Sequence, residues 1–103
     1  MYTQQEVIEK MIPVLKQYPI KRAALFGSYA RNEQTEKSDL DIVLEPFPDT
    51  CVRIFYFLVD LEDTLRMKAD VLTTRQLMSE EDYDIHGPFR ERVKKDLRWF
   101  YEL

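Results

Sequence analysis

The 103-residue sequence is poor in several residue types, and each shortage excludes a class of protein. Its single cysteine, Cys51, cannot form an internal disulfide, which fits a reducing cytoplasm better than a secreted, disulfide-stabilised domain. No apolar run approaches the roughly 20 residues of a membrane-spanning helix, and the N-terminus has no signal-peptide pattern. We therefore expect a cytoplasmic protein that does not enter a membrane.

The sequence also lacks an excess of basic residues, because 15 Lys and Arg stand against 19 Asp and Glu, for a net charge of −4. Neutralisation of phosphates by Lys and Arg dominates the affinity for nucleic acids, so this balance argues against a nucleic-acid partner but not against a bound nucleotide. The only histidine, His86, has no second metal-binding residue nearby, and we interpret it as a loop residue. No repeat or linker divides the chain, which predicts one domain over residues 1–103.

Two closely spaced aspartates, Asp39 and Asp41, are the first residues that indicate a chemistry. The apolar residues between and after them predict a strand, in which alternate side chains share a face, so Leu40 and Ile42 should face the core and both carboxylates the opposite side. Two ionised carboxylates on one face repel each other unless a divalent cation holds them, and oxygen ligands suit Mg²⁺ or Mn²⁺. The pair therefore predicts a metal site.

A glycine and a serine precede this pair by about ten residues. Residues 23–26 predict a short strand that runs into Gly27, and residues 28–31 predict the first turn of a helix. The free backbone N–H groups and the hydroxyl of Ser28 at such a helix start bind phosphate well, and Gly27 permits a close approach of the backbone. Arg31, about one turn later, is placed to contact the same anion or to cover the loop.

The order Gly27-Ser28-x-Ala30-Arg31 and then Ser38-Asp39-x-Asp41 resembles the motif of the DNA polymerase beta-like nucleotidyltransferase superfamily. Within it, the chain is similar to the small prokaryotic minimal nucleotidyltransferases (MNT), which serve as antitoxins of HEPN-domain toxins. The resemblance covers most of the chain and implies an α+β fold, with a small mixed β-sheet flanked by helices. One departure is Asn32, where the family usually has glycine, although asparagine also tolerates a left-handed conformation.

The resemblance also implies roles for individual residues. The nucleotide phosphates would be held by Gly27, Ser28, Arg31 and Ser38. The catalytic carboxylates, which would also bind the metal, are Asp39, Asp41 and Asp70.

Asp70 is the only carboxylate in the short apolar run of residues 68–73. An isolated carboxylate in a core strand is costly unless it is paired or bound to a metal. The resemblance makes Asp70 the third catalytic carboxylate, on a strand beside the one that carries Asp39 and Asp41. The alternative is an acid at the edge of a strand that faces water.

The resemblance implies a Mg²⁺-dependent transfer of AMP from ATP, with pyrophosphate as the leaving group. Because so short a chain leaves little surface to recognise an acceptor, we expect a protein acceptor, which through the family would be a tyrosine of a HEPN toxin. Two alternatives stay open: a non-catalytic antitoxin that neutralises its HEPN partner by forming a complex, and a nucleotidyltransferase of small molecules. The sequence leaves the nucleotide base, the acceptor and a possible homo-oligomer undetermined.

Three helical segments complete the interpretation. Residues 3–6 have the form of a capping box before an amphipathic helix. Asp49 or Thr50 is expected to cap a second helix, whose six consecutive apolar residues 54–59 are either core or an interface with a partner. The last segment is expected to be helical from Pro88 as far as Tyr101, and its basic residues form either a solvated face or a dock for an acidic partner. Glu45 is interpreted as a surface acid at the end of a strand, the alternative being a residue that supports the metal-binding carboxylates.

Overall fold

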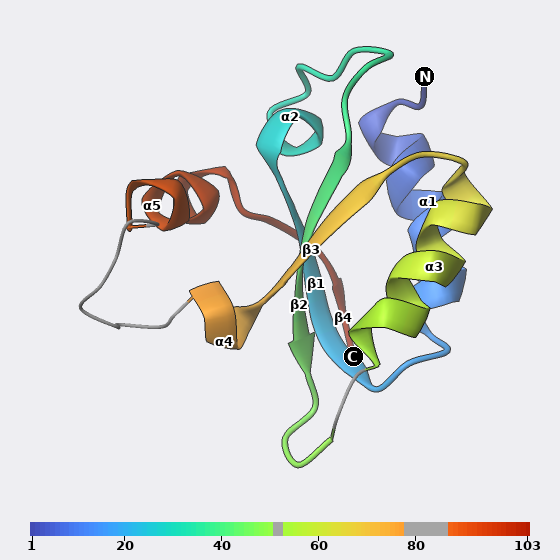
Figure 1. Ribbon diagram of the computed structural model, residues 1–103, viewed down its shortest axis with the longest axis vertical. Coiled ribbons are helices and arrows are strands. Elements are labelled where there is room, and N and C mark those ends of the chain that lie inside the picture. Colours follow the sequence, from blue (N-terminus) through green and yellow to red (C-terminus); the bar gives the residue numbers. More distant parts are fainter. Residues whose placement is uncertain (51–52, 78–86) are drawn as a thin grey trace.

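The computed structural model describes residues 1–50, 53–77 and 87–103 of the chain. In chain order its elements are α1 (Gln4–Leu15), β1 (Ile20–Phe26), α2 (Gly27–Ala30), β2 (Leu40–Pro46), α3 (Ile54–Leu65), β3 (Ala69–Thr73), α4 (Thr74–Leu77), α5 (Gly87–Asp96) and β4 (Arg98–Glu102) (Figure 1). This is the α+β fold that the sequence predicts. The interpretations of Cys51 and His86 concern residues outside the described ranges.

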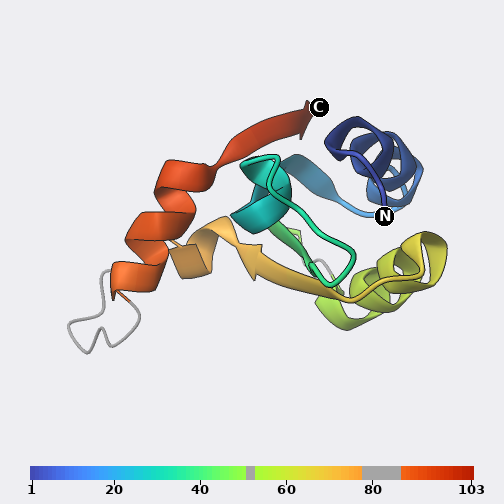
Figure 2. The same ribbon diagram turned by 90° about the horizontal axis from the view of Figure 1, so that it is seen from above.

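The four strands form one mixed sheet in the order β3-β2-β1-β4. β1 is antiparallel to both β2 and β4, whereas β2 and β3 are parallel. Helices α1 and α3 cover one face of this sheet, and α4 and α5 lie on the opposite side (Figure 2). The small mixed sheet flanked by helices is therefore confirmed.

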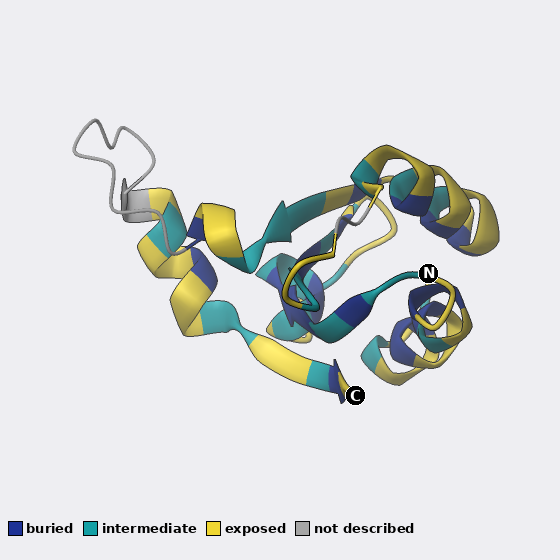
Figure 3. Ribbon diagram, turned by 90° about the horizontal axis from the view of Figure 1, so that it is seen from below, coloured by how far each residue is buried: buried dark blue, intermediate teal, exposed yellow. Residues whose placement is uncertain are grey.

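The core is divided between the two faces of the sheet. The larger cluster joins α1 and α3 to the sheet and includes Leu40 and Ile42, both completely buried as predicted. The smaller cluster lies under α4 and α5 and consists of Ala24, Phe26, Val43, Leu77 and Val93. Figure 3 shows the buried residues of α1 and α3 on the sides that face inward. Strand β2 is thus buried on both faces, which fixes its position firmly.

The N-terminal helix also holds the start of the site. The predicted capping box is confirmed, because the Thr3 hydroxyl accepts from the Glu6 amide and the Glu6 carboxylate accepts from the Thr3 amide. One residue on, the Gln4 side-chain amide donates to the carbonyls of Tyr29 and Ala30 at the end of α2, at 2.7 and 3.2 Å. Helix α1 therefore fixes the short helix that follows β1.

The predicted cap of the second helix is wrong. Helix α3 begins at Ile54, and its N-cap residue is Arg53, which makes no side-chain capping bond. The Thr50 hydroxyl donates instead to the carbonyl of Phe47 at 2.5 Å, and Asp49 has a positive φ of 62°. Both candidates belong to the turn after β2, because the local side-chain bond to Phe47 competes with capping.

The predicted helix through Tyr101 is also wrong at its end. Helix α5 stops at Asp96, and residues 98–102 form β4, which pairs with β1. Without β4, β1 would be an edge strand with unpaired backbone groups. The aromatic residues of this segment also suit a strand. A long-range backbone pairing thus overrides a helix-like spacing of apolar residues.

The apolar residues 54–59 are divided between core and surface. Phe57 is completely buried, whereas Phe55, Tyr56 and Val59 are 72, 58 and 48 % exposed. The sequence leaves open whether this segment is core or interface. In the structure one face of α3 is in the core and the other is exposed at the surface. Among the described helices, none is both long enough and apolar enough to cross a membrane.

Candidate functional site

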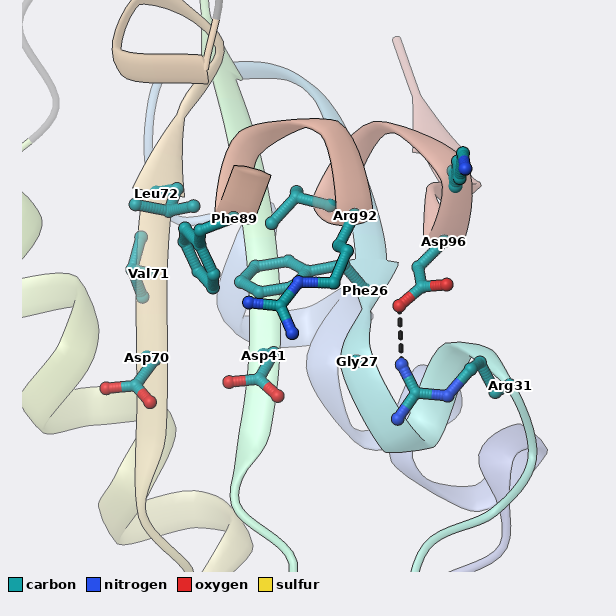
Figure 4. A pocket seen from close by; sticks show the side chains of 12 residues that line it. Phe26, Gly27, Arg31, Asp41, Asp70, Val71, Leu72, Phe89, Arg92 and Asp96 are labelled. Atoms are coloured by element: carbon teal, nitrogen blue, oxygen red, sulfur yellow. Dashed lines mark hydrogen bonds and ion pairs between the residues drawn. The ribbon is translucent and has the colours of Figure 1, made fainter. Parts of the chain in front are cut away.

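Asp41 and Asp70 lie opposite each other on two parallel strands. Asp41 is the second residue of β2 and Asp70 the second residue of β3, and the two are partners in the strand register. Their carboxylates lie side by side at the floor of a cavity (Figure 4). Strand β3 is an edge strand and Asp70 is exposed, as its alternative interpretation requires, yet it stands directly beside the half-buried Asp41.

The environment of Asp41 disfavours its negative charge. Burial is the largest cause, followed by the charges of Asp70 and then Asp39, and together they raise the pKa of Asp41 to about 6 from an ordinary value of 3.8. The positive charge of Arg31 opposes this shift only weakly. Asp41 is therefore a carboxylate that a divalent cation would stabilise in its ionised form.

Gly27 is required at its position by Asp41. Its φ is +70°, and a Cβ atom there would lie 2.3 Å from Oδ2 of Asp41. The neighbouring Phe26 is paired with Asp41 in the strand register, which explains why the backbone after β1 passes so close to this side chain. The sequence predicts a close backbone approach to phosphate here, and the structure contains a close approach to a carboxylate.

The other predicted residues lie around this pair at different depths. Asp39 is exposed just before β2, and its charge reaches Asp41, as the raised pKa indicates. Ser28 is half-buried in the first turn of α2. Ser38 is half-buried in the turn before β2, where its hydroxyl accepts from the amide of Thr35 at 2.9 Å. None of these three residues lines the cavity above Asp41, and Ser38 lines a second cavity, between the N-terminus and the end of α3.

Arg31 covers the loop and lines the cavity at the same time. Its Nε donates to Glu33 at 3.2 Å, and its Nη1 donates to Asp96 at the end of α5 at 2.5 Å. The pKa of Arg31 is raised by these two carboxylates. The predicted contact with an anion therefore competes with two ion pairs. Asn32 follows with a φ of 60°, the left-handed conformation that the sequence anticipates for it.

The cavity has a volume of about 560 Å³ and three chemically distinct parts. Its floor carries the two carboxylates of Asp41 and Asp70, which we call the acidic floor. Its sheet side is apolar and consists of Phe26, Val71 and Leu72. The side formed by α5, which we call the α5 wall, consists of Phe89, Arg92, Val93, Lys95 and Asp96, and Gly27 and Arg31 complete the lining.

The sequence did not place the α5 wall at the site. The sequence analysis interprets the basic residues of this segment as a solvated face or as a dock for an acidic partner. The helical spacing of Phe89, Arg92, Val93 and Asp96 puts them on one face, and this signal was present in the sequence. What the sequence could not supply is the position of that face over the acidic floor, because it depends on how β4 pairs with β1.

The comparison with known families decides the identity of this arrangement. The family model described as "Polymerase beta, Nucleotidyltransferase" matches residues 9–87, well over half of the chain, and includes both strands of the acidic floor. The chain belongs to the polymerase beta-type nucleotidyltransferase family. The resemblance inferred from the sequence motifs is thereby confirmed.

Relatives and solved structures agree with this family. This nucleotidyltransferase is 47 % identical over 73 residues to "Putative protein adenylyltransferase MJ0435" of Methanocaldococcus jannaschii, a match covering 66 % of the chain and 74 % of the relative. It is 35 % identical over 96 residues to "Putative protein adenylyltransferase MJ0126" of the same organism, covering 90 % of each.

Two structural neighbours come from toxin–antitoxin complexes. The crystal structure of a toxin–antitoxin with AMP-PNP matches with a TM-score of 0.69 at 21 % identity, over 93 % of this chain and 73 % of that one. A structure of a tri-AMPylated Shewanella oneidensis HEPN toxin in complex with MNT antitoxin matches with a TM-score of 0.64 at 20 % identity. The match covers 97 % of this chain and 73 % of that one. At these identities the similarity establishes the fold of the nucleotidyltransferase.

The donor set of the acidic floor fits Mg²⁺. No group of three carboxylate, histidine or cysteine side chains is close enough to hold a metal within residues 1–50, 53–77 and 87–103. Mg²⁺ does not need such a cage, because it is usually bound by one or two carboxylates together with water and substrate phosphates. Asp41 and Asp70 supply two carboxylates side by side, and the raised pKa of Asp41 reflects a local excess of negative charge that a divalent cation would offset.

Proposed function

We propose that this nucleotidyltransferase transfers AMP from ATP to a hydroxyl group of a protein partner in a Mg²⁺-dependent reaction, and that the acceptor is a tyrosine of a HEPN-domain toxin. The observation that carries the proposal is the half-buried Asp41 beside Asp70 on the floor of a cavity large enough for a nucleotide. In this scheme Asp39, Asp41 and Asp70 bind the metal. Gly27, Ser28, Arg31 and Ser38 hold the phosphates directly or shape the turns that do.

The chemical step is a substitution at the α-phosphorus. The acceptor hydroxyl forms a new O–P bond, the bond between the α-phosphorus and the bridging oxygen breaks, and pyrophosphate leaves. Mg²⁺ held by these carboxylates would stabilise the developing charge and would lower the pKa of the attacking hydroxyl. Asp70, exposed on the edge strand, is placed to take the hydroxyl proton, and the absence of a side chain at Gly27 leaves room for the carboxylate of Asp41.

Two observations favour a protein acceptor. Relatives that are 47 and 35 % identical bear the name of protein adenylyltransferases. The outer face of α3 also exposes Phe55, Tyr56 and Val59, an apolar surface of the kind that protein partners cover. An acceptor bound there would be recognised outside the cavity.

Mass spectrometry of the acceptor tests the proposal. The purified chain is incubated with Mg²⁺, ATP and a HEPN-domain protein encoded beside it, and the acceptor is then digested and its peptides are mapped. We expect the mass of AMP on a tyrosine, and no modification with Asp41→Asn. Glu9→Gln on the exposed side of α1, outside the cavity and the apolar face of α3, is the matched control, which should modify the acceptor as the unaltered chain does. An unmodified acceptor in a stable complex would instead support the non-catalytic antitoxin.

A further inference from the structure

The α5 wall brings two cations, Arg92 and Lys95, to the cavity that holds the acidic floor. Within the described part of the chain, neither Arg92 nor Lys95 takes part in an ion pair, whereas Asp96, the third charged residue of the wall, does. Asp96 is occupied by Arg31, and Lys94, on the other side of the helix, contacts Glu91 at 3.6 Å. Figure 4 shows the Arg92 side chain reaching from α5 toward the floor where Asp41 and Asp70 lie.

This arrangement of charge fits a polyphosphate that carries a metal. Once Arg31 and Asp96 are set aside as a pair, the cavity holds two carboxylates on its floor and two cations on its wall. Among the ion pairs of the described residues, none joins these carboxylates to these cations. An anion placed between them, with a divalent cation on the carboxylate side, would satisfy both sets at once.

The same wall carries an aromatic side chain one helical turn before Arg92. Phe89 contacts Phe26 edge to face, with 6.3 Å between ring centroids, and is still 41 % exposed at the cavity. Leu72 lines the cavity opposite. Residues three apart on a helix are neighbours, so an apolar, aromatic surface adjoins the cation. A nucleobase or ribose needs such a surface next to its phosphates.

We propose that α5 is the nucleotide-binding wall of the enzyme, with Arg92 binding the β- and γ-phosphates and Phe89 packing against the nucleoside. The inference rests on the proposed function, because it assigns further binding residues to the same site. In this assignment a residue of α5, a helix outside the sequence motifs, binds part of the triphosphate that the motifs assign to the turn after β1. Arg92 then distinguishes nucleotides by their number of phosphates. Phe89 contributes equally to the affinity for nucleotides with one phosphate and for those with three.

Equilibrium binding with nucleotides of different length tests the assignment. The ligands are AMP and α,β-methylene-ATP, whose α–β bridge is not cleaved in nucleotidyl transfer, each with Mg²⁺. Arg92→Gln should raise the dissociation constant of the triphosphate analogue by about tenfold, the usual effect of losing one hydrogen bond to a charged group, and that of AMP much less. Lys94→Gln, on the same helix but outside the cavity, should leave both constants unchanged.

A second variant distinguishes an effect on nucleoside binding from an effect on the stability of the fold. Phe89→Leu keeps an apolar side chain against Phe26, and it should weaken AMP and the triphosphate analogue by the same factor while the melting temperature stays close to that of the unaltered chain. If Arg92→Gln binds the triphosphate analogue as tightly as Lys94→Gln does, or loses AMP and the analogue equally, the assignment of Arg92 is wrong. If Phe89→Leu leaves both affinities unchanged, the assignment of Phe89 is wrong.

These results are independent of the transfer reaction. Normal AMP transfer to the HEPN partner together with unaffected binding by both variants would reject the α5 wall and leave the proposed function standing. Binding that depends on Arg92 without any transfer would support the wall and reject the catalytic proposal. If the unaltered chain binds no nucleotide in the presence of Mg²⁺, both proposals fail.

Discussion

Gly27 and Asp41 are in such close contact that no other residue fits at position 27 while Asp41 keeps its place. A Cβ atom would lie 2.3 Å from Oδ2 and 3.1 Å from Cγ of Asp41, and the φ of +70° is itself unfavourable for a residue with a side chain. The glycine of the motif therefore also determines where the carboxylate of the acidic floor lies.

We predict that Gly27→Ala displaces Asp41 and abolishes AMP transfer, at a cost of about 1 to 3 kcal/mol in the free energy of unfolding. Transfer assays and denaturant melts measure the two effects. The control is a double-mutant cycle, because Asp41→Ala removes the atoms that the new methyl group meets. In that background Gly27→Ala should cost less, and an equal cost in both backgrounds would show that the contact is unimportant.

The raised pKa of Asp41 makes a specific prediction for stability. Its folded pKa of about 6 lies above the ordinary value of 3.8, so the ionised carboxylate destabilises the folded state above pH 6 and ceases to do so as the pH falls below about 4. Asp41→Asn should therefore raise the melting temperature at pH 7.5 and have little effect at pH 4. The exposed Asp63→Asn is the control at pH 7.5 and at pH 4. A rise in the melting temperature of Asp41→Asn that is the same at both pH values would contradict the assigned pKa.

The two faces of α3 should respond oppositely to the same substitution. Tyr56→Glu, at an exposed position, should leave the melting temperature nearly unchanged and break the complex with the HEPN partner. Phe57→Glu, at a completely buried position beside it, should unfold the domain, because it buries an unpaired carboxylate. Thermal melts and gel filtration separate the two effects. An intact complex with Tyr56→Glu would exclude this face as the interface.

We predict that Glu45 contributes to stability and not to the reaction. It forms two hydrogen bonds with Arg22, both at 3.0 Å, and the Arg22 guanidinium lies 3.9 Å from the ring centre of Trp99 on β4. The contact with Arg22 lowers the pKa of Glu45, so this contribution to stability is present near neutral pH and is lost on acidification. Glu45→Gln should lower the stability by at most about 1 kcal/mol, because the pair is partly exposed. Transfer should be unchanged, and a loss of transfer would place Glu45 in the site.

Much of the site could be predicted from local sequence because local rules determine it. Strand alternation placed Leu40 and Ile42 in the core, and the isolated acid in an apolar run marked Asp70 as a residue to explain. These inferences need no knowledge of distant pairings. The motif that contains Gly27 and Asp41 added the expected family, which the comparison with known families confirms.

The parts that could not be predicted depend on contacts between distant segments. Strand β4 has a helix-like spacing of apolar residues, and only its pairing with β1 makes it a strand. The same pairing sets the direction in which α5 ends and so brings Arg92 to the cavity. Arg31 has the local features of an anion-binding residue, and only the position of Asp96 reveals that it is already in an ion pair.

The release of pyrophosphate from labelled ATP tests the central claim most directly. The chain is incubated with the HEPN partner and ATP labelled at the α-phosphate, with Mg²⁺ or with a chelator, and both the label on the partner and the free pyrophosphate are measured. We expect equal amounts of the two with Mg²⁺, and neither with the chelator or with Asp41→Asn. Equal transfer by Asp41→Asn and the unaltered chain, or transfer that continues in the chelator, would contradict a metal-dependent nucleotidyltransferase built on Asp41 and Asp70.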